Sequence, residues 1–312
     1  MSYQSNRSIL EKAEFALSHL VTNGGLLLPA QAQKFMRLSI EEAVLLGQVT
    51  YRPMNRAREE IDQIKFGSRV LRAAQELTAL SVADQVVPDI SVVELDAQEF
   101  IGEVTISDRV FEENIEQGDF RQTIMQLLSP AVGRDLEEVV INGDKTSADP
   151  FLAQFDGILV QAQSNVVDWG SAPIDEDLFH DMLKALPPRY RKNRNQLRFY
   201  TASDAEVSLR QLRKNRESPV GDKFLETDAP IVAAGIPVQG VPLFPENLGM
   251  GSDETVVILT HPKNIHVGVR RQIRIEWERS IRRRALSVVV TLEADTKFAE
   301  EEGVVKAIGV TL

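Results

Sequence analysis

The residue types that perform acid–base chemistry or bind metals are few in this chain, and their spacing does not form a site. There is no cysteine, and the four histidines are His19, His180, His261 and His266. His261 and His266 stand in the segment HPKNIH, which contains no carboxylate. Zinc sites draw their ligands from clustered cysteine, histidine and carboxylate side chains. We therefore interpret these two residues as a loop histidine and a strand histidine.

Two adjacent carboxylates, Glu137 and Glu138, come nearest to an acid–base pair. Consecutive residues of a helix point about 100° apart, so these side chains do not face each other. We predict that both lie on a solvated helix face. The sequence also has no P-loop, no GxGxxG after a strand and no GxSxG. It therefore predicts no catalytic residue, no cofactor, no metal site and no enzymatic activity.

An arginine-rich stretch is the remaining candidate for binding chemistry. Its members are Arg270, Arg271, Arg274, Arg279, Arg282, Arg283 and Arg284. Guanidinium groups suit phosphates, but Glu276 and Glu278 interrupt the stretch, and Trp277 is its one aromatic residue. We favour salt bridges between subunits, with loose contact to DNA as the alternative.

The strongest structural element is a helix predicted over residues 120–141. Its apolar residues recur at helical spacing. They are Phe120, Ile124, Leu128, Val132, Leu136 and Val139 or Val140. Asp119 with Gln122 resembles a capping box, and Asn142-Gly143 offers a left-handed residue that ends the helix. Pro130 removes one backbone donor, so we expect a bend near the middle.

The segment before residue 90 is less clearly patterned. Helices are predicted over residues 8–23, where Ser8 and Glu11 make a capping box, and over residues 29–46. Residues 50–88 are polar and strongly charged, without a clean period. Two interpretations stay open for this stretch: an extended two-stranded limb, or a helix over residues 56–76, whose composition favours helix.

The remaining elements are predicted from alternation and turn signals. We expect strands over residues 92–110, 155–160, 196–201, 256–260, 267–278, 286–292 and 304–310. One helix begins after Asp175 and stops at Pro187-Pro188, and another runs from Ser203 to about residue 215. This mixture, without strict strand–helix alternation, indicates the α+β class.

Composition is that of a soluble globular protein. The chain has 312 residues, 43% of them hydrophobic and 26% charged, which allows one large domain or two lobes. The absence of cysteine excludes disulfides. The N-terminus, MSYQSNRSILEKAEF, has no apolar signal core, and no apolar run approaches the roughly 20 residues of a membrane span. We expect cytoplasmic synthesis and no membrane partner.

The net charge of −11 is unevenly distributed. Residues 86–150 contain fifteen acids and four bases, a net charge of −11 in that segment alone. Residues 189–216 contain nine bases and two acids, a net charge of +7. Two interpretations stay open: two solvated faces, or charge complementarity between neighbouring copies, which salt would weaken.

The order of the segments resembles the major capsid proteins of tailed bacteriophages, which have the Hong Kong ninety-seven type fold. VVELDAQEFIGEVTISDRVFEEN leads into the long helix, which ends in INGD and is soon followed by DGIL. RFYTASDAEVSLRQL, SPVGDKFL and GIPVQGVPLFPENLG follow in order. The likeness lies in this order and spacing over about two hundred residues.

This resemblance implies four parts: an N-terminal arm (1–48), an extended loop (49–90), a peripheral domain (91–170 and 285–312, with the spine helix at about 119–142), and an axial domain (171–284). It implies a shell protein that self-assembles into hexamers and pentamers around double-stranded DNA, which it contacts non-specifically. The virion capsid is the expected location, with assembly in the host cytoplasm. A portal is an expected partner, and a decoration protein is left open.

Alternatives are a nanocompartment shell protein of the encapsulin type and, from another class, a soluble enzyme. Because family members with a fused scaffolding region have about a hundred extra N-terminal residues, which this sequence lacks after Met1, we expect a separate scaffolding protein. Some members also form isopeptide cross-links from a loop lysine to a C-terminal asparagine, aided by a glutamate. Lys65 and Glu293 match two of these positions, but no asparagine follows Asn264, so we predict no cross-linking.

Overall fold

The structure is a computed structural model that describes residues 43–66, 69–71, 86–107, 120–214, 230–251, 253–270 and 274–312. The helix expected over residues 8–23, residues 29–42 of the helix expected over 29–46, and the capping residue Asp119 lie outside the described residues. Residues 44–46, the predicted end of the second helix, form a turn instead. The described chain forms a five-stranded sheet, a six-stranded sheet and a two-stranded hairpin. This mixture of helices and sheets agrees with the α+β prediction.

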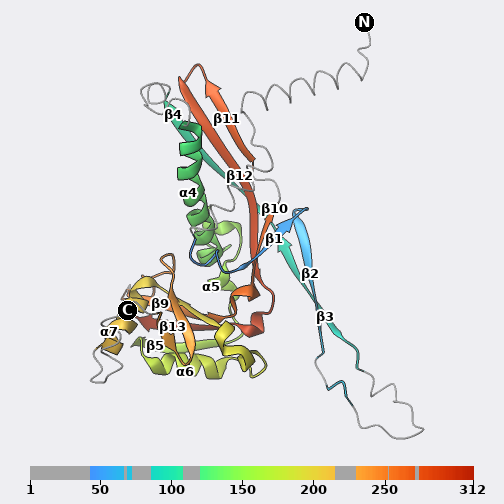
Figure 1. Cartoon of the computed structure of the whole chain (residues 1–312), viewed down its shortest axis with the longest axis vertical. Coiled ribbons are helices and arrows are strands. Elements are labelled where there is room, and N and C mark those ends of the chain that lie inside the picture. Colours follow the sequence, from blue (N-terminus) through green and yellow to red (C-terminus); the bar gives the residue numbers. More distant parts are fainter. Residues whose placement is uncertain are drawn as a thin grey trace, which may run out of the picture.

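The five-stranded sheet is built around one long strand, β12 (Figure 1). Its members are β1 (Thr50–Met54), β4 (Gln98–Ser107), β10 (Ile265–Arg270), β11 (Arg274–Ser280) and β12 (Ala285–Phe298). One edge of β12 pairs with β4, and the other pairs with β11 and then β10. The sequence predicted one strand over residues 267–278, whereas the structure has two, because β10 and β11 pair with different parts of β12.

The long helix is confirmed as α4 (Phe120–Asn142), with Pro130 inside it. It lies beside β4 and β12 (Figure 1). Ile124, Leu136 and Val139 of its apolar stripe are buried, and they belong to one hydrophobic core with residues of the sheet. The spacing of apolar residues therefore predicted which side of α4 packs.

The helix does not end as predicted, because Gly143 has no positive φ. Its N–H continues the helical pattern by donating to Val139 O at 2.8 Å, and Gly157 N donates to Gly143 O at 2.8 Å. A Cβ on Gly143 would lie 2.6 Å from Val139 O and would also collide with Phe155 O. A Cβ on Gly157 would lie 2.6 Å from Ile141 O. The two glycines of INGD and DGIL thus permit close backbone packing at the end of α4.

Three short elements follow α4 and lead to the second sheet: η2 (Leu152–Gln154), α5 (Ile158–Gln161) and β5 (Val166–Pro173). The predicted strand over residues 155–160 is wrong, since α5 occupies its second half. Ile158 is fully buried beneath the end of α4. Apolar runs of this length do not distinguish helix from strand. The prediction of a strand failed for this reason, and the run forms a single helical turn.

The six-stranded sheet has the order β5-β13-β9-β6-β8-β7. Its later members are β6 (Arg198–Thr201), β7 (Val232–Ala233), β8 (Ile236–Gly240), β9 (Glu254–Thr260) and β13 (Val305–Thr311). Helices α6 (Glu176–Ala185) and α7 (Ser203–Lys214) pack against it. Asp175 caps α6 as predicted, accepting from Glu176 N at 2.6 Å. Strand β13 lies in this sheet, paired with β5 and β9, whereas the expected division assigned all of residues 285–312 to the peripheral domain.

The hairpin consists of β2 (Arg58–Lys65) and β3 (Asp89–Asp96), and it projects from the body beside β1 (Figure 1). Strand β2 excludes the helical interpretation for residues 58–65. The predicted strand over residues 92–110 is two strands, β3 in the hairpin and β4 in the five-stranded sheet. Near its base, Ile61 and Leu95 are buried in a small cluster with Met54 and Ala97.

Candidate functional site

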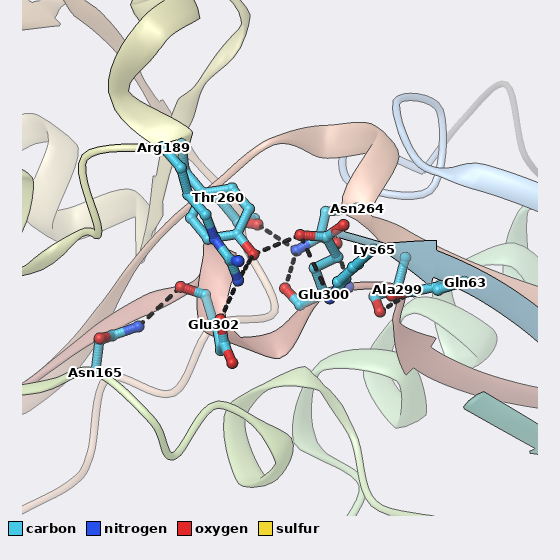
Figure 2. Close-up of polar contacts among 10 residues, drawn as sticks. Gln63, Lys65, Asn165, Arg189, Thr260, Asn264, Ala299, Glu300 and Glu302 are labelled. Atoms are coloured by element: carbon cyan, nitrogen blue, oxygen red, sulfur yellow. Dashed lines mark hydrogen bonds and ion pairs between the residues drawn. The ribbon is translucent and has the colours of Figure 1, made fainter. Parts of the chain in front are cut away.

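A polar junction lies where the hairpin, the five-stranded sheet and the six-stranded sheet meet (Figure 2). Its centre is the connection from β12 to β13, which contains η5 (Glu301–Gly303). Asn264, at the end of η4 (Pro262–Asn264), holds this connection from one side. Its side chain donates to Glu300 O at 2.8 Å and accepts from Glu300 N at 2.7 Å, while Ala299 N donates to Asn264 O at 2.8 Å.

Three consecutive glutamates in this connection interact with residues that are distant in sequence. Glu300 accepts from the Tyr190 hydroxyl, and Glu302 accepts from Arg189. Glu301 accepts from Ser164 N at 2.6 Å and from Gln163 N at 2.7 Å. Burial raises the pKa of Glu301, but the hydrogen bonds from Ser164 and Gln163 outweigh it, so the pKa of Glu301 is lowered. The charged carboxylates thus join segments that are far apart in sequence.

Tyr190, at the start of η3 (Tyr190–Gln196), is the packing centre of the junction. Arg189 lies over its ring, 4.6 Å from the centroid, and its Nη2 donates to the Tyr190 hydroxyl at 2.5 Å. A Cβ on Gly303 would lie 3.3 Å from the ring, so this glycine admits close contact. Burial, followed by the hydrogen bond to Glu300, raises the pKa of Tyr190. The hydroxyl therefore stays protonated and donates at neutral pH.

The hairpin enters the junction through β2. Lys65 Nζ lies 3.7 Å from Glu300 Oε2, and Gln63 donates from its side chain to Ala299 O. Lys65 therefore faces Glu300 within the chain, whereas Glu293 pairs with Arg270 at 2.6 Å. The absence of cross-linking between subunits stays a prediction.

One face of the hairpin is apolar and exposed. Ile64 and Ile90 are directly opposite each other across the two strands. Side chains alternate between faces along a strand, so Val92 lies on the same face as this pair, opposite Asp62. Phe66 follows directly after the end of β2. Ile64, Phe66, Ile90 and Val92 are 66%, 59%, 63% and 50% exposed. We call these four residues the apolar face of the hairpin. Exposed apolar side chains gathered on one face mark an interaction surface.

Glu137 corrects a prediction, because it is buried rather than solvated, with 4% of its surface exposed. Its Oε1 accepts from Leu45 N and, at 3.3 Å, from Leu46 N. Burial raises the pKa of Glu137, and the backbone hydrogen bonds partly oppose this. Glu138 is half-buried. Glu137 therefore binds the segment before β1 to the middle of the chain.

The basic segment at residues 189–216 is partly neutralised within the chain. Arg189, Arg210 and Arg213 pair with Glu302, Glu206 and Glu176. Two further arginines, Arg191 and Arg198, donate to backbone carbonyls. In the second basic stretch, Arg270 pairs with Glu293, while Arg282, Arg283 and Arg284 lie exposed in the turn between β11 and β12. Arg271 lies outside the described residues.

His261 and His266 occupy the loop and strand positions predicted for them. His261 precedes η4, and its Nδ1 accepts from Lys263 N at 3.0 Å. His266 lies on β10, and its Nδ1 accepts from Arg52 Nε at 2.8 Å. His180 is exposed on α6, and His19 lies outside the described residues. Among the described residues, no three His, Cys, Asp or Glu side chains are grouped as metal ligands would be.

Sequence reasoning missed the junction. The run AEEEGVV between two predicted strands is a signal of a charged turn, but nothing in it points to Tyr190, Arg189 or Asn264 as partners. Their contacts span 36 or more residues of sequence, so only the folded chain brings them together.

A family model and a sequence relative identify the same family. The model of the Phage capsid family matches residues 23–307. A relative from Bacillus subtilis (strain 168), described as "Putative prophage capsid protein YqbE", is 38% identical over 309 residues, covering 98% of this chain and 99% of the relative. Among the described residues, no helix is long and apolar enough to cross a membrane.

Solved structures show the same fold at low sequence identity. The satellite phage P4 procapsid including size determination (Sid) protein has a TM-score of 0.70 at 13% identity, covering 96% of this chain and 98% of that one. The capsid of an empty GTA particle has a TM-score of 0.64 at 16% identity, covering 86% and 90%. The SrpI encapsulin of Synechococcus elongatus PCC 7942 has a TM-score of 0.58 at 14% identity, covering 86% and 90%.

Proposed function

The chain belongs to the phage capsid family, and from this membership we propose how its parts build the shell. It is a structural protein of a bacteriophage capsid and not an enzyme. We propose that copies form the hexamers and pentamers of an icosahedral shell, and that the apolar face of the hairpin lies on an adjacent copy. The encapsulin alternative rests on fold similarity alone.

The two sheets support a division into two domains that differs from the sequence-based one. The peripheral domain would consist of α4 and the five-stranded sheet, which adds residues 265–280 to it. The axial domain would consist of the six-stranded sheet with α6 and α7, which adds residues 305–311. The hairpin would be the extended loop, and the polar junction would hold it against the body through Lys65 and Gln63 of β2.

The observation that carries the proposal is the exposure of the apolar face. A two-stranded hairpin alone is marginally stable in water, and burying a large apolar side chain stabilises by roughly 1.5–3 kcal/mol. Four such side chains, each at least half exposed, would contribute several kcal/mol per contact. The hairpin projects from the body (Figure 1), and these four side chains stay exposed in the single chain. An adjacent copy would supply the cover.

Further partners are proposed on the same basis. The structure of the satellite phage P4 procapsid includes a size determination (Sid) protein, and we propose a separate scaffolding protein for this chain. A portal, non-specific contact with packaged DNA and assembly in the host cytoplasm complete the proposal, and a decoration protein is left open.

The test is shell formation by Ile90→Asp and Ser91→Asp. The two positions are adjacent and exposed, and they point to opposite faces of β3. We expect wild type and Ser91→Asp to form closed shells in electron micrographs, and Ile90→Asp to remain as unassembled subunits of unchanged thermal stability. Equal assembly by the two variants would show that the apolar face is not a subunit contact.

A further inference from the structure

A basic surface lies on η3, η4 and the start of β6. Two neighbouring hollows open there, of about 420 and 440 Å³, and they share Asn195 and Gln196. Lys192 and Arg194 line the first hollow, and Arg198 and Lys263 line the second. We call these four cationic residues the basic surface. No acidic residue lines either hollow, although the chain has 46 acids and 35 bases.

Three basic residues near this surface have acidic partners. Arg189, Arg210 and Arg213 all pair with glutamates. Within the part of the chain that the structure describes, none of the four residues of the basic surface forms an ion pair. Arg198 Nη1 donates to Asn195 O and Leu197 O, at 2.8 Å each, which holds the guanidinium in place without neutralising it.

The pKa of His261, which lines the second hollow, is lowered in part by the positive charges around it. Burial, and then the charges of Lys263 and Arg198, lower the pKa of His261, so the imidazole is neutral at neutral pH. Because Nδ1 accepts from Lys263 N, the proton of the neutral ring is on Nε2. The ring is therefore a hydrogen-bond donor beside the two cations. With the amides of Asn195 and Gln196, the surface offers donors and positive charge together.

We propose that the basic surface binds the phosphate backbone of double-stranded DNA, an inference that rests on the proposed enclosure of a genome by this shell. Lysine, arginine and amide side chains are the groups that contact phosphates without reading sequence. The hollows are lined by polar and charged groups, with Pro262 as the one apolar lining residue. Such a lining suits the phosphate backbone of DNA better than it suits an apolar side chain of a protein partner.

An acidic segment of a second copy is the rival occupant. The described acidic strand β3 suits it less, because Glu94 and Asp96 already pair with Arg58 in the same hairpin. DNA phosphates, by contrast, have no fixed protein partner and are exchanged for counterions.

The test compares two double variants with the same loss of charge, in the unassembled full-length chain. Lys192→Gln with Arg194→Gln alters the basic surface. Arg282→Gln with Arg283→Gln alters the exposed turn between β11 and β12, the alternative DNA contact. Anisotropy of a fluorescent duplex of about 20 base pairs is followed from about 50 to 300 mM salt, because each phosphate contact contributes about 0.9 to the slope of log K against log salt.

We expect the first variant to lower this slope by about 2 and the affinity at about 50 mM salt by roughly 100-fold, and the second to bind as wild type does. Equal losses, or a loss in the second variant alone, would overturn the assignment. So would absence of wild-type binding, or displacement of the duplex by a peptide of residues 98–119. Electron microscopy of the same proteins separates the proposal of shell assembly from the proposal of DNA binding. If the wild-type protein forms shells but does not bind the duplex, only the DNA-binding proposal is contradicted. Shell failure confined to the first variant would make the surface a subunit contact.

Discussion

Replacing Glu137 by alanine and by glutamine measures how the segment before β1 is held to α4. Both hydrogen bonds, from Leu45 N and Leu46 N, reach Oε1 of a side chain that is 4% exposed. Alanine removes the acceptor and leaves two buried N–H groups unpaired, at about 1–3 kcal/mol each. Glutamine keeps an oxygen that can occupy the Oε1 position.

We expect Glu137→Ala to lower the free energy of unfolding by about 4 kcal/mol and Glu137→Gln to lower it by less than about 1 kcal/mol at pH 7. Urea titration of the unassembled chain provides the measurement. Amide hydrogen exchange at Leu45 and Leu46 should accelerate in the alanine variant and not in the glutamine variant. Glu138→Ala is the matched control, since its side chain is half-buried with no hydrogen bond in the described part of the chain.

The pH dependence supplies a second readout of the same site. Burial raises the folded-state pKa of Glu137 above the value of about 4.3 expected when unfolded. The folded chain then holds this proton more tightly, so the site's contribution to stability is present below about pH 4.3 and is lost as pH rises through the raised folded pKa. Wild type should therefore lose stability relative to Glu137→Gln over that interval. An alanine variant as stable as Glu138→Ala, or parallel pH profiles for wild type and Glu137→Gln, would refute the reasoning.

Three other substitutions have distinct expected outcomes in thermal unfolding. Asn264→Ala removes the side-chain clamp on the connection from β12 to β13 and should cost about 2 kcal/mol; an unchanged melting temperature would contradict the clamp. Gly143→Ala forces a Cβ against the backbone oxygen of Phe155 and should lower the free energy of unfolding by about 3 kcal/mol. This prediction fails if the variant has the same melting temperature as wild type. Glu302→Gln breaks an ion pair with Arg189 whose side chains are 63% and 50% exposed, so we expect a change below about 0.5 kcal/mol. A larger loss would mean that this pair contributes more than exposed pairs do.

The parts of the fold that the sequence predicted are those set by local signals. The apolar spacing from Ile124 to Val140 gave α4 its length and its packed side, and Asp175 with the apolar residues after it predicted α6. The family resemblance came from the order of such segments, and the match to residues 23–307 confirms it. Periodicity and capping act within a few residues, so they can be read before the chain is folded.

Tertiary structure decided what depends on distant partners. Glu137 and Glu138 are indistinguishable by type and spacing, and only the presence of the amides of residues 45 and 46 makes one of them a buried acceptor. Gly143 is required by the approach of Phe155, not by its own backbone conformation. Strand β13 pairs with β5 and β9 through hydrogen bonds between segments that are far apart in sequence. Pairings of this kind depend on which surfaces meet after folding, and no local pattern specifies them.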